Sequence, residues 1–343
     1  MPPCSDLVAL DIGGANLKAA DGLGWSRSVS FPLWKRWRDL PVALTSLVAD
    51  RQPRRIVATM TGEICDCYAS RAEGVAQIAD SLTAAAAALG CSDPPDVYLV
   101  DGRIVPASDA SGHWRLAAAS NWHILARLAA SLLPTGRGML LDIGSTTTDI
   151  VPLQNGRPAP LAHDDPGRMR CGELVYTGLE RTPVAAIVRR LPHRGQWRPV
   201  ASERFADSRD AWLLLAALRE DAADHDTADG GPATSAAARV RIARTMLLDP
   251  DAFTAADAIA AAERIADRQA AQVARGVRRV FRAVGRRPDA VVISGHGGPL
   301  AERVLRAVGW DLERHDLAAC LGPGVARAAA AHALACLVRE AVG

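Results

Sequence analysis

The sequence predicts an α/β protein with two duplicated lobes and a cleft between them, and three observations lead to this prediction. Apolar strands alternate with helical segments, which favours helices layered on sheets. A strand, a glycine turn and a returning strand occur twice, around Asp11 and around Asp142. The 343 residues also exceed what one small core needs. We expect a first lobe over residues 1–130, a second over 131–324, and a C-terminal helix, 325–343, that packs back on the first.

The first lobe is expected to open with a hairpin, because Gly13 and Gly14 interrupt an apolar strand. A later apolar run ends in a polar loop, residues 61–66, and a helix is ended by Pro134 and Gly136. The predicted strands of this lobe cover residues 7–12, 16–20, 55–60 and 97–100, and its helices cover residues 74–89 and 117–133.

The second lobe repeats the hairpin and then becomes more helical. Thr254 and Asp257 fit a capping pair at the start of a long helix. Small polar residues over 221–236 predict an exposed loop. The predicted strands cover residues 139–143, 149–153 and 290–294. Helices are predicted over 254–284, over 325–342 and over most of 174–248, where a break falls at 191–199.

The charge and cysteine content of the chain bear on its binding partners and its cellular compartment. The net charge is +2, from 40 basic and 38 acidic residues, which gives no case for a nucleic acid or a membrane as partner. Seven cysteines without framework spacing favour the reducing cytoplasm. Cys65 and Cys67 form a weak metal signal, and ordinary thiols are the alternative. We expect small-molecule substrates, and the sequence leaves the oligomeric state open, a homodimer included.

The first glycine turn has the composition of an anion-binding site. Asp11 ends an apolar strand, so its carboxylate can face the cleft. Gly13 and Gly14 let backbone N–H groups approach phosphate oxygens. Asn16 and Lys18 add side-chain donors. The alternative is a tight hairpin with an exposed lysine.

The second turn repeats this order with a run of hydroxyl groups. Its phosphate-binding candidates are Gly144, Ser145, Thr146 and Thr147. Asp142 and Asp149 can hold Mg²⁺ directly or through water. Adjacent threonines are also typical of ordinary strands. Two copies of Asp-Ile-Gly at equivalent strand ends nevertheless favour phosphate binding.

A third glycine loop follows the strand at 290–294. Its members are Gly295, His296, Gly297 and Gly298. This composition suits close approach to a flat base, a sugar or a phosphate, and His296 can hydrogen-bond a ligand or be merely exposed. The fingerprints G-x-G-x-x-G and G-x-x-x-x-G-K-[ST] are absent, which argues against dinucleotide-binding and P-loop folds.

These three loops, in this order, resemble the actin, hexokinase and heat-shock-protein-70 superfamily, whose lobes are ribonuclease H-like. The resemblance implies two phosphate loops and an adenosine loop. It also implies Mg²⁺ near Asp11 and Asp142, and it leaves ATP open as a ligand. Residues 118–125 and 322–329 resemble the hinge segments of that superfamily.

A more specific set of motifs points to one family. They are Phe31-Pro-Leu-Trp34, Thr59-Met-Thr-Gly-Glu-Ile-Cys-Asp66, Glu73-Gly-Val75, Ser120-Asn-Trp122, Gly172-Glu-Leu-Val-Tyr-Thr-Gly178 and Arg181-Thr-Pro-Val184. In this order they resemble the hydantoinase-A-like proteins linked to tetrahydromethanopterin-dependent one-carbon metabolism. They are also similar to the archaeal aryl-ether synthase of methanofuran biosynthesis.

That resemblance implies a transferase. The phenol oxygen of γ-glutamyltyramine, or of a tyrosine-derived analogue, attacks the methylene carbon of (5-(aminomethyl)furan-3-yl)methyl diphosphate, and diphosphate leaves. Two alternatives stay open: an ATP-dependent small-molecule kinase or ATPase of the same fold, and a non-catalytic nucleotide-binding scaffold.

The reaction needs a base, because a phenol with a pKa of about 10 is about one part in a thousand ionised at neutral pH. Glu63 is the first candidate, followed by Asp66 and Glu173. Further residues are candidates for contacts with the substrates. Asp149 or Asp66 can bind the aminomethyl cation, and Arg170 or Arg181 can bind a carboxylate. The aromatic rings can stack on Trp34, Trp37, Trp122 or Tyr176, and Asn121 beside Trp122 is a further candidate. For each aromatic or arginine, packing in the core or exposure at the surface is the alternative.

Overall fold

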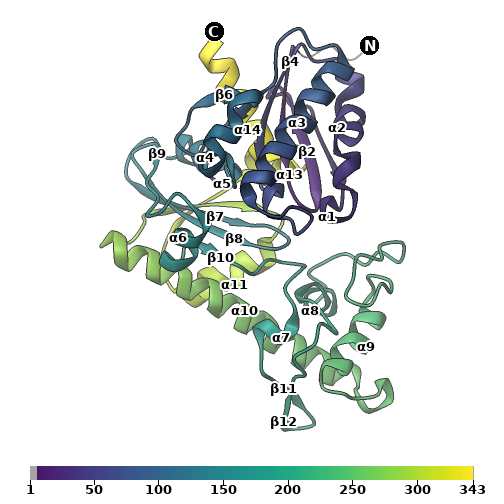
Figure 1. Ribbon diagram of the computed structural model, residues 1–343. Helices are drawn as coiled ribbons and strands as arrows, with labels where there is room; N and C mark the ends of the chain where they lie inside the picture. Colours follow the sequence, from purple (N-terminus) through teal and green to yellow (C-terminus); the bar gives the residue numbers. More distant parts are fainter. Residues whose placement is uncertain (1–5, 343) are drawn as a thin grey trace. The chain divides into compact units, whose positions relative to one another are not determined.

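The computed structural model describes residues 6–342, and in them the predicted α/β class is confirmed. These residues form two compact units (Figure 1). The first unit contains the described residues up to Leu140, the segment Val151–Arg168 and the described residues from His315. The second contains Leu141–Ile150 and Met169–Arg314.

The first sheet has six strands in the order β3-β2-β1-β4-β5-β6. The strands are β1 (Leu7–Ile12), β2 (Asn16–Ala20), β3 (Ser26–Ser30), β4 (Arg55–Met60), β5 (Asp96–Tyr98) and β6 (Ile104–Pro106). The predicted hairpin is confirmed, since β1 and β2 are antiparallel, whereas β4 runs parallel to β1. The register places Asp11 opposite Lys18 on one side and opposite Thr59 on the other.

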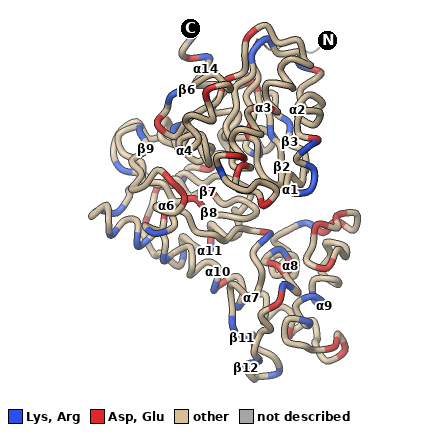
Figure 2. The backbone as a smooth tube through the Cα atoms, viewed as in Figure 1, with Lys and Arg blue, Asp and Glu red and all other residues tan. Residues whose placement is uncertain are grey.

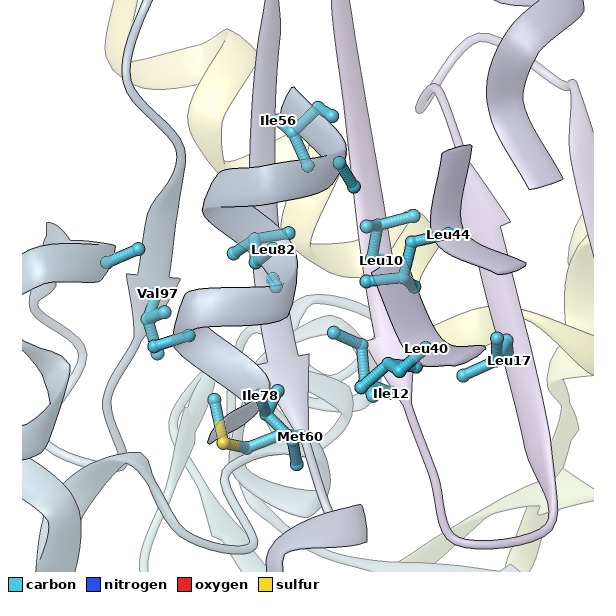
Figure 3. Packing of buried hydrophobic residues seen from close by; sticks show 14 of the residues in the cluster. Leu10, Ile12, Leu17, Leu40, Leu44, Ile56, Met60, Ile78, Leu82 and Val97 are labelled. Carbon is cyan, nitrogen blue, oxygen red and sulfur yellow. The ribbon is translucent and has the colours of Figure 1, made fainter. Parts of the chain in front are cut away.

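Helices cover both faces of this sheet. On one face lie α2 (Leu40–Val48) and α3 (Arg71–Leu89), whose apolar side chains meet those of β1, β2 and β4 (Figure 3). On the other lies α14 (Ala329–Val342), which contacts β1, β2 and β4 largely through alanines. The fully buried side chains of the first face include Leu10, Ile12, Leu17, Leu40, Leu44, Ile56, Met60, Ile78, Leu82 and Val97.

The remaining elements of the first unit are short. They are α1 (Leu33–Arg36), α4 (Trp114–Ala117), α5 (Asn121–Ser131), α12 (Leu317–Leu321), α13 (Pro323–Arg327) and the 3₁₀ helices η1 (Trp37–Asp39), η2 (Ala49–Arg51), η3 (Gly62–Ile64) and η4 (Ala107–His113). The predicted helix over 117–133 is confirmed as α5, but it begins only at Asn121, because Ala119 has a φ of 49° and separates α4 from α5. The predicted helix over 325–342 is likewise divided between α13 and α14.

The second sheet has the order β10-β8-β7-β13-β14, and β9 also pairs with β8. Its strands are β7 (Arg137–Ile143), β8 (Thr148–Gln154), β9 (Arg157–Pro158), β10 (Leu174–Val175), β13 (Ala290–Gly295) and β14 (Glu313–Asp316). The chain thus repeats the strand–turn–strand arrangement at β7 and β8, as the sequence predicts.

The prediction of a mostly helical stretch over 174–248 was wrong. Its described helices are short, and the predicted break at 191–199 coincides with a hairpin, β11 (Arg190–His193) and β12 (Gln196–Pro199), where Pro192 and Pro199 lack the N–H that a helix needs. The other helices between residues 165 and 308 are α6 (Asp165–Cys171), α7 (Val184–Ile187), α8 (Ser208–Leu214), α9 (Ser235–Thr245), η5 (Pro250–Ala252), α10 (Ala255–Val284) and α11 (Gly298–Val308). The long helix α10 and its capping box of Thr254 and Asp257 are confirmed.

Basic and acidic residues are interspersed along the described part of the chain (Figure 2). Within residues 6–342, no helix has both the length and the apolar composition of a transmembrane span.

Candidate functional site

The first glycine turn connects β1 to β2 and is closed by a hydrogen bond from Gly13 N to Asn16 O of 3.1 Å. The chain that follows folds over the turn, since Leu33 N donates to Gly14 O at 2.9 Å. A Cβ atom at Gly14 would lie 2.9 Å from the Sγ atom of Cys65, so a side chain does not fit there without movement. The turn is therefore held between two neighbouring loops of its own unit.

Asp11 lies at the end of β1 and is only 2% exposed. Its Oδ2 atom accepts a hydrogen bond from Lys18 Nζ at 3.1 Å, while its buried Oδ1 atom has no hydrogen-bond partner in the described part of the chain. A buried carboxylate oxygen without a partner is unfavourable, so this atom suits a bound cation or water.

An oxygen ligand of this kind fits Mg²⁺, which prefers carboxylates and retains several waters. Among residues 6–342, no three Asp, Glu, His or Cys side chains gather into a metal cluster, Cys65 and Cys67 included. A magnesium ion held by one or two carboxylates agrees with this finding, because it needs no such cage.

Glu63 lies on η3, in the loop that follows β4. Thr61 N donates to Ile12 O at 2.9 Å, which places this loop beside the first turn. The Glu63 side chain is 1% exposed, and neither of its carboxylate oxygens makes a hydrogen bond to a described residue. Burial raises its pKa to about 7, although the charge of Arg71 lowers it somewhat.

The start of α5 lies at the same end of β4. Ser120 N donates to Met60 O at 3.1 Å, and the Ser120 hydroxyl lies 2.8 Å from the Thr59 hydroxyl. Asn121 is the first residue of α5, and the Trp122 ring is buried beneath the Arg168 guanidinium, 3.9 Å from the ring centroid. The first unit therefore brings Asp11, the glycine turn, Glu63 and the start of α5 to one edge of its sheet, whereas Asp66 is exposed.

The second turn is built like the first. Gly144 N donates to Thr147 O at 2.9 Å, which matches the bond that closes the first turn. The segment Gly178–Arg181, here called the cover segment, lies on this turn. Leu179 N donates to Gly144 O at 2.9 Å, and Glu180 N donates to Ser145 O at 3.0 Å. The Ser145 hydroxyl lies 3.4 Å from that of Thr146.

Gly178 makes the closest backbone approach in the cover segment. A Cβ atom there would lie 2.5 Å from both Ser145 C and Thr146 N. Because these are backbone atoms, they have little freedom to move aside. The glycine that ends the Gly-Glu-Leu-Val-Tyr-Thr-Gly motif is thus required by packing on the second turn.

A buried glutamine on α10 anchors the cover segment, and the sequence prediction missed it. Gln269 Nε2 donates to Thr177 Oγ1 at 2.9 Å and to Gly178 O at 2.6 Å. Its Oε1 atom accepts from Trp212 Nε1 at 3.0 Å. The available signal was a glutamine on the otherwise apolar face of a long amphipathic helix.

The third glycine loop lies against the end of β7. Gly297 N donates to Ile143 O at 3.1 Å, and a Cβ atom at Gly295 would lie 3.0 Å from Asp142 Oδ1. His296 Nε2 lies 3.3 Å from Glu180 Oε1, which joins this loop to the cover segment. Gly298 begins α11. The second unit therefore brings Asp142, the second turn and the third loop together.

The other predicted residues of the second unit lie nearby in the chain but differ in exposure. Glu173 is completely buried, and its carbonyl accepts from Ile150 N at 2.7 Å. Asp149 is half-buried in β8. Tyr176 is 58% exposed, and Arg181 forms an ion pair of 3.6 Å with Asp226.

Comparison with known proteins gives a sequence family. The model of the hydantoinase/oxoprolinase family matches residues 54–175. A synthase of Methanocaldococcus jannaschii is 30% identical over 246 residues, which are 71% of this chain and 72% of that protein. It is named (4-{4-[2-(gamma-L-glutamylamino)ethyl]phenoxymethyl}furan-2-yl)methanamine synthase. A protein of the same name from Methanococcus vannielii is 34% identical over 121 residues, 35% of this chain and 54% of that protein.

Solved structures are similar to this chain at low sequence identity. A nucleotide-free structure of acetone carboxylase matches 88% of this chain and 49% of that one, with a TM-score of 0.50 and 14% identity. A ROK hexokinase from Thermus thermophilus matches 98% of this chain and 99% of that one, with a TM-score of 0.44 and 16% identity.

Proposed function

The chain belongs to the family of the (4-{4-[2-(gamma-L-glutamylamino)ethyl]phenoxymethyl}furan-2-yl)methanamine synthases, and from this we propose that it forms the aryl ether of a methanofuran-type cofactor. The phenol oxygen of γ-glutamyltyramine, or of a tyrosine-derived analogue, bonds to the methylene carbon of (5-(aminomethyl)furan-3-yl)methyl diphosphate. The bond from that carbon to the diphosphate oxygen breaks, and the phenol proton passes to a base. The sequence identity to a curated synthase over most of both chains carries this proposal.

The leaving diphosphate is assigned to the glycine turns. Backbone N–H groups of Gly14 and Ser145, with the Lys18 ammonium and the hydroxyls of Thr146 and Thr147, supply preorganised donors for an anion. Donors of this kind act most strongly where charge develops in the transition state. Because the turns are fixed by hydrogen bonds within their own units, they need little rearrangement to bind an anion.

Asp11 and Asp142 are the proposed ligands of Mg²⁺, and the partnerless Oδ1 atom of Asp11 supports this assignment among the described residues. When bound, the ion would neutralise negative charge on the diphosphate. The role of the protein is to keep these carboxylates in place: Lys18 holds Asp11 from the neighbouring strand, and Gly295 leaves room beside Asp142.

Glu63 is the proposed base. A carboxyl group whose pKa is about 7 is partly ionised at neutral pH and still basic enough to accept a proton. Burial without hydrogen bonds to the described residues is the physical cause of that pKa. Asp66 is exposed, whereas Glu63 is buried in the loop beside the first glycine turn. Glu63 is therefore preferred to Asp66, and Glu173 in the second unit stays the alternative.

The remaining predictions are kept as proposals. Asp149, Asn121, Trp122, Tyr176 and Arg181 are candidate substrate contacts. A cytoplasmic location and the absence of nucleic-acid or membrane partners rest on composition alone, and the homodimer stays open. A kinase of the same fold is not favoured, because the curated relatives are named as synthases.

The test is a coupling assay with purified protein, Mg²⁺, the furan diphosphate and γ-glutamyltyramine. We expect the coupled product by mass spectrometry and one diphosphate released for each ether formed. ATP turnover without coupling would instead indicate the kinase or ATPase.

Two substitutions test the diphosphate site in this assay. We expect Asp11→Asn and Asp142→Asn each to lower kcat/KM by about 100-fold or more, the loss typical of one removed charge-stabilising group. Asp39→Asn is the matched control, because Asp39 is exposed and pairs with Arg36. If either aspartate variant kept wild-type turnover, its assignment to Mg²⁺ would be wrong.

A further inference from the structure

Glu180 is fixed in place by its backbone. Its N–H donates to Ser145 O in the second turn at 3.0 Å, and its carbonyl accepts from Arg209 N at 3.2 Å. The residues on either side, Leu179 and Arg181, donate to the same turn. The Glu180 side chain therefore starts from a rigid point next to the proposed diphosphate site.

The side chain is held from the third glycine loop. Glu180 Oε1 lies 3.3 Å from His296 Nε2, and the side chain is 29% exposed, so a ligand can reach it. Partial burial raises the pKa of Glu180, but the hydrogen bond and charge of His296 and the charge of Arg209 lower it more, so it lies below its ordinary value. The group is therefore an anion at neutral pH.

The other described carboxylates around the cover segment are less suited to bind a cation from solution. Asp224 forms an ion pair with Arg209, and Asp226 forms one with Arg181. Glu173 is completely buried, and Asp142 is the proposed metal ligand. Glu180 differs from these four because it is accessible, has no arginine ion pair among the described contacts, and is not assigned to the metal.

The furan substrate of the proposed reaction carries an aminomethyl group, which is an ammonium ion at neutral pH. We propose that Glu180, held by His296, binds this ammonium and so selects aminomethylfurans over uncharged furans. The inference rests on the proposed function and names the recognition group for one end of its substrate. A hydrogen-bonded ion pair in a partly buried place is stronger than the same pair in open solvent.

The test compares two substrates in wild type and variant. The first is the aminomethylfuran diphosphate, and the second is an analogue with methyl in place of aminomethyl. We expect Glu180→Gln to lower kcat/KM for the first by about 10- to 100-fold, the usual loss for a hydrogen bond to a charged group. For the analogue we expect a change below about 3-fold. Gln keeps the shape and can still accept a hydrogen bond from His296.

Matched variants separate recognition from structure. Glu302→Gln is the control, because Glu302 is an exposed carboxylate paired with Arg314, and we expect no discrimination to be lost. An equal loss on both substrates in Glu180→Gln would overturn the inference and leave the proposed function intact. Loss of discrimination in Asp149→Asn or Asp66→Asn, with Glu180→Gln unchanged, would overturn it as well. A wild-type enzyme that couples neither substrate would overturn the proposed function itself.

Discussion

Glu63, the proposed base, is a residue at which we expect stability and activity to oppose each other. A carboxyl group that is buried without hydrogen bonds to the described residues prefers the protonated form in the folded protein. In the unfolded chain its pKa returns to about 4.5. Between these two pKa values the folded state binds the proton and the unfolded state does not, so stability falls as the pH rises from about 4.5 to about 7.

We expect Glu63→Gln to stabilise the protein above pH 7 and to abolish most of its activity. The stabilisation is up to about 3 kcal/mol, the equivalent of a pKa raised from 4.5 to about 7. The loss in kcat is about 10²- to 10⁴-fold, because the general base is removed. Urea unfolding at pH 5 and pH 8, together with the coupling assay, measures both effects.

The pH dependence of the reaction adds an internal control. Wild-type kcat/KM should rise as the pH passes about 7, because the base must be ionised. The variant Asp66→Asn changes an exposed carboxylate in the same loop, and its profile should keep that rise. A wild-type profile that is flat between pH 5.5 and 8.5 would exclude Glu63 as the base.

At the scale of elements, the first and second glycine turns have the same construction. Each follows a buried strand, is closed by a bond from a glycine N–H to a carbonyl three residues later, and is overlain by a later segment of its own unit. In the second unit the cover segment is held by Gln269, so a side chain on α10 fixes a turn that lies far earlier in the chain.

We expect Gly178→Ala to displace the cover segment from the second turn. The new methyl group would meet the backbone of Ser145 and Thr146, and overpacking of this kind costs about 1–3 kcal/mol. The Kd for magnesium diphosphate should rise by at least about 10-fold, measured by titration calorimetry, with a lower Tm.

Gly112→Ala is the control for that substitution, because no described atom lies within 4 Å of the Cβ position at Gly112. It should leave both the Kd and the Tm near wild type. Wild-type diphosphate binding in Gly178→Ala would show that the second turn does not depend on its cover segment.

At the scale of the whole molecule, binding of magnesium diphosphate should raise the free energy of unfolding. A ligand that binds only the folded state at 100 times its Kd contributes about 2.7 kcal/mol. We therefore expect magnesium diphosphate to raise the Tm by several degrees, and EDTA to reverse the increase. Asp11→Asn should lose the shift, and an equal shift with diphosphate and EDTA together would argue against a metal at Asp11.

Much of this architecture could be predicted from the sequence because its signals are local. The Asp-Ile-Gly turns, the hairpin return of 16–20 and the capping box of Thr254 each lie within a few residues. The strand–turn–strand repeat also identified both turns in advance. The hairpin β11–β12 was missed because its two prolines indicated only an interruption, and its pairing partner could not be inferred.

The missed site residues depend on contacts between distant segments. Gln269 acts on Gly178, which is 91 positions away. Glu180 becomes a candidate only when the fold places it on Ser145 and beside His296. Nothing in the local sequence distinguishes this glutamate from a surface residue, so neither role could be read before the fold was known.

The helix α14 supplies one covering layer of the first sheet, although it is the last described helix along the chain. During synthesis on the ribosome, β1, β2 and β4 emerge long before the alanines that pack on them. The face of the sheet that α14 covers therefore stays exposed while the entire second unit is translated. Exposed apolar surface on a partly folded chain favours aggregation. A chain that ends just before Ala329 would keep this face of the sheet uncovered, and we expect it to be less soluble than the full chain.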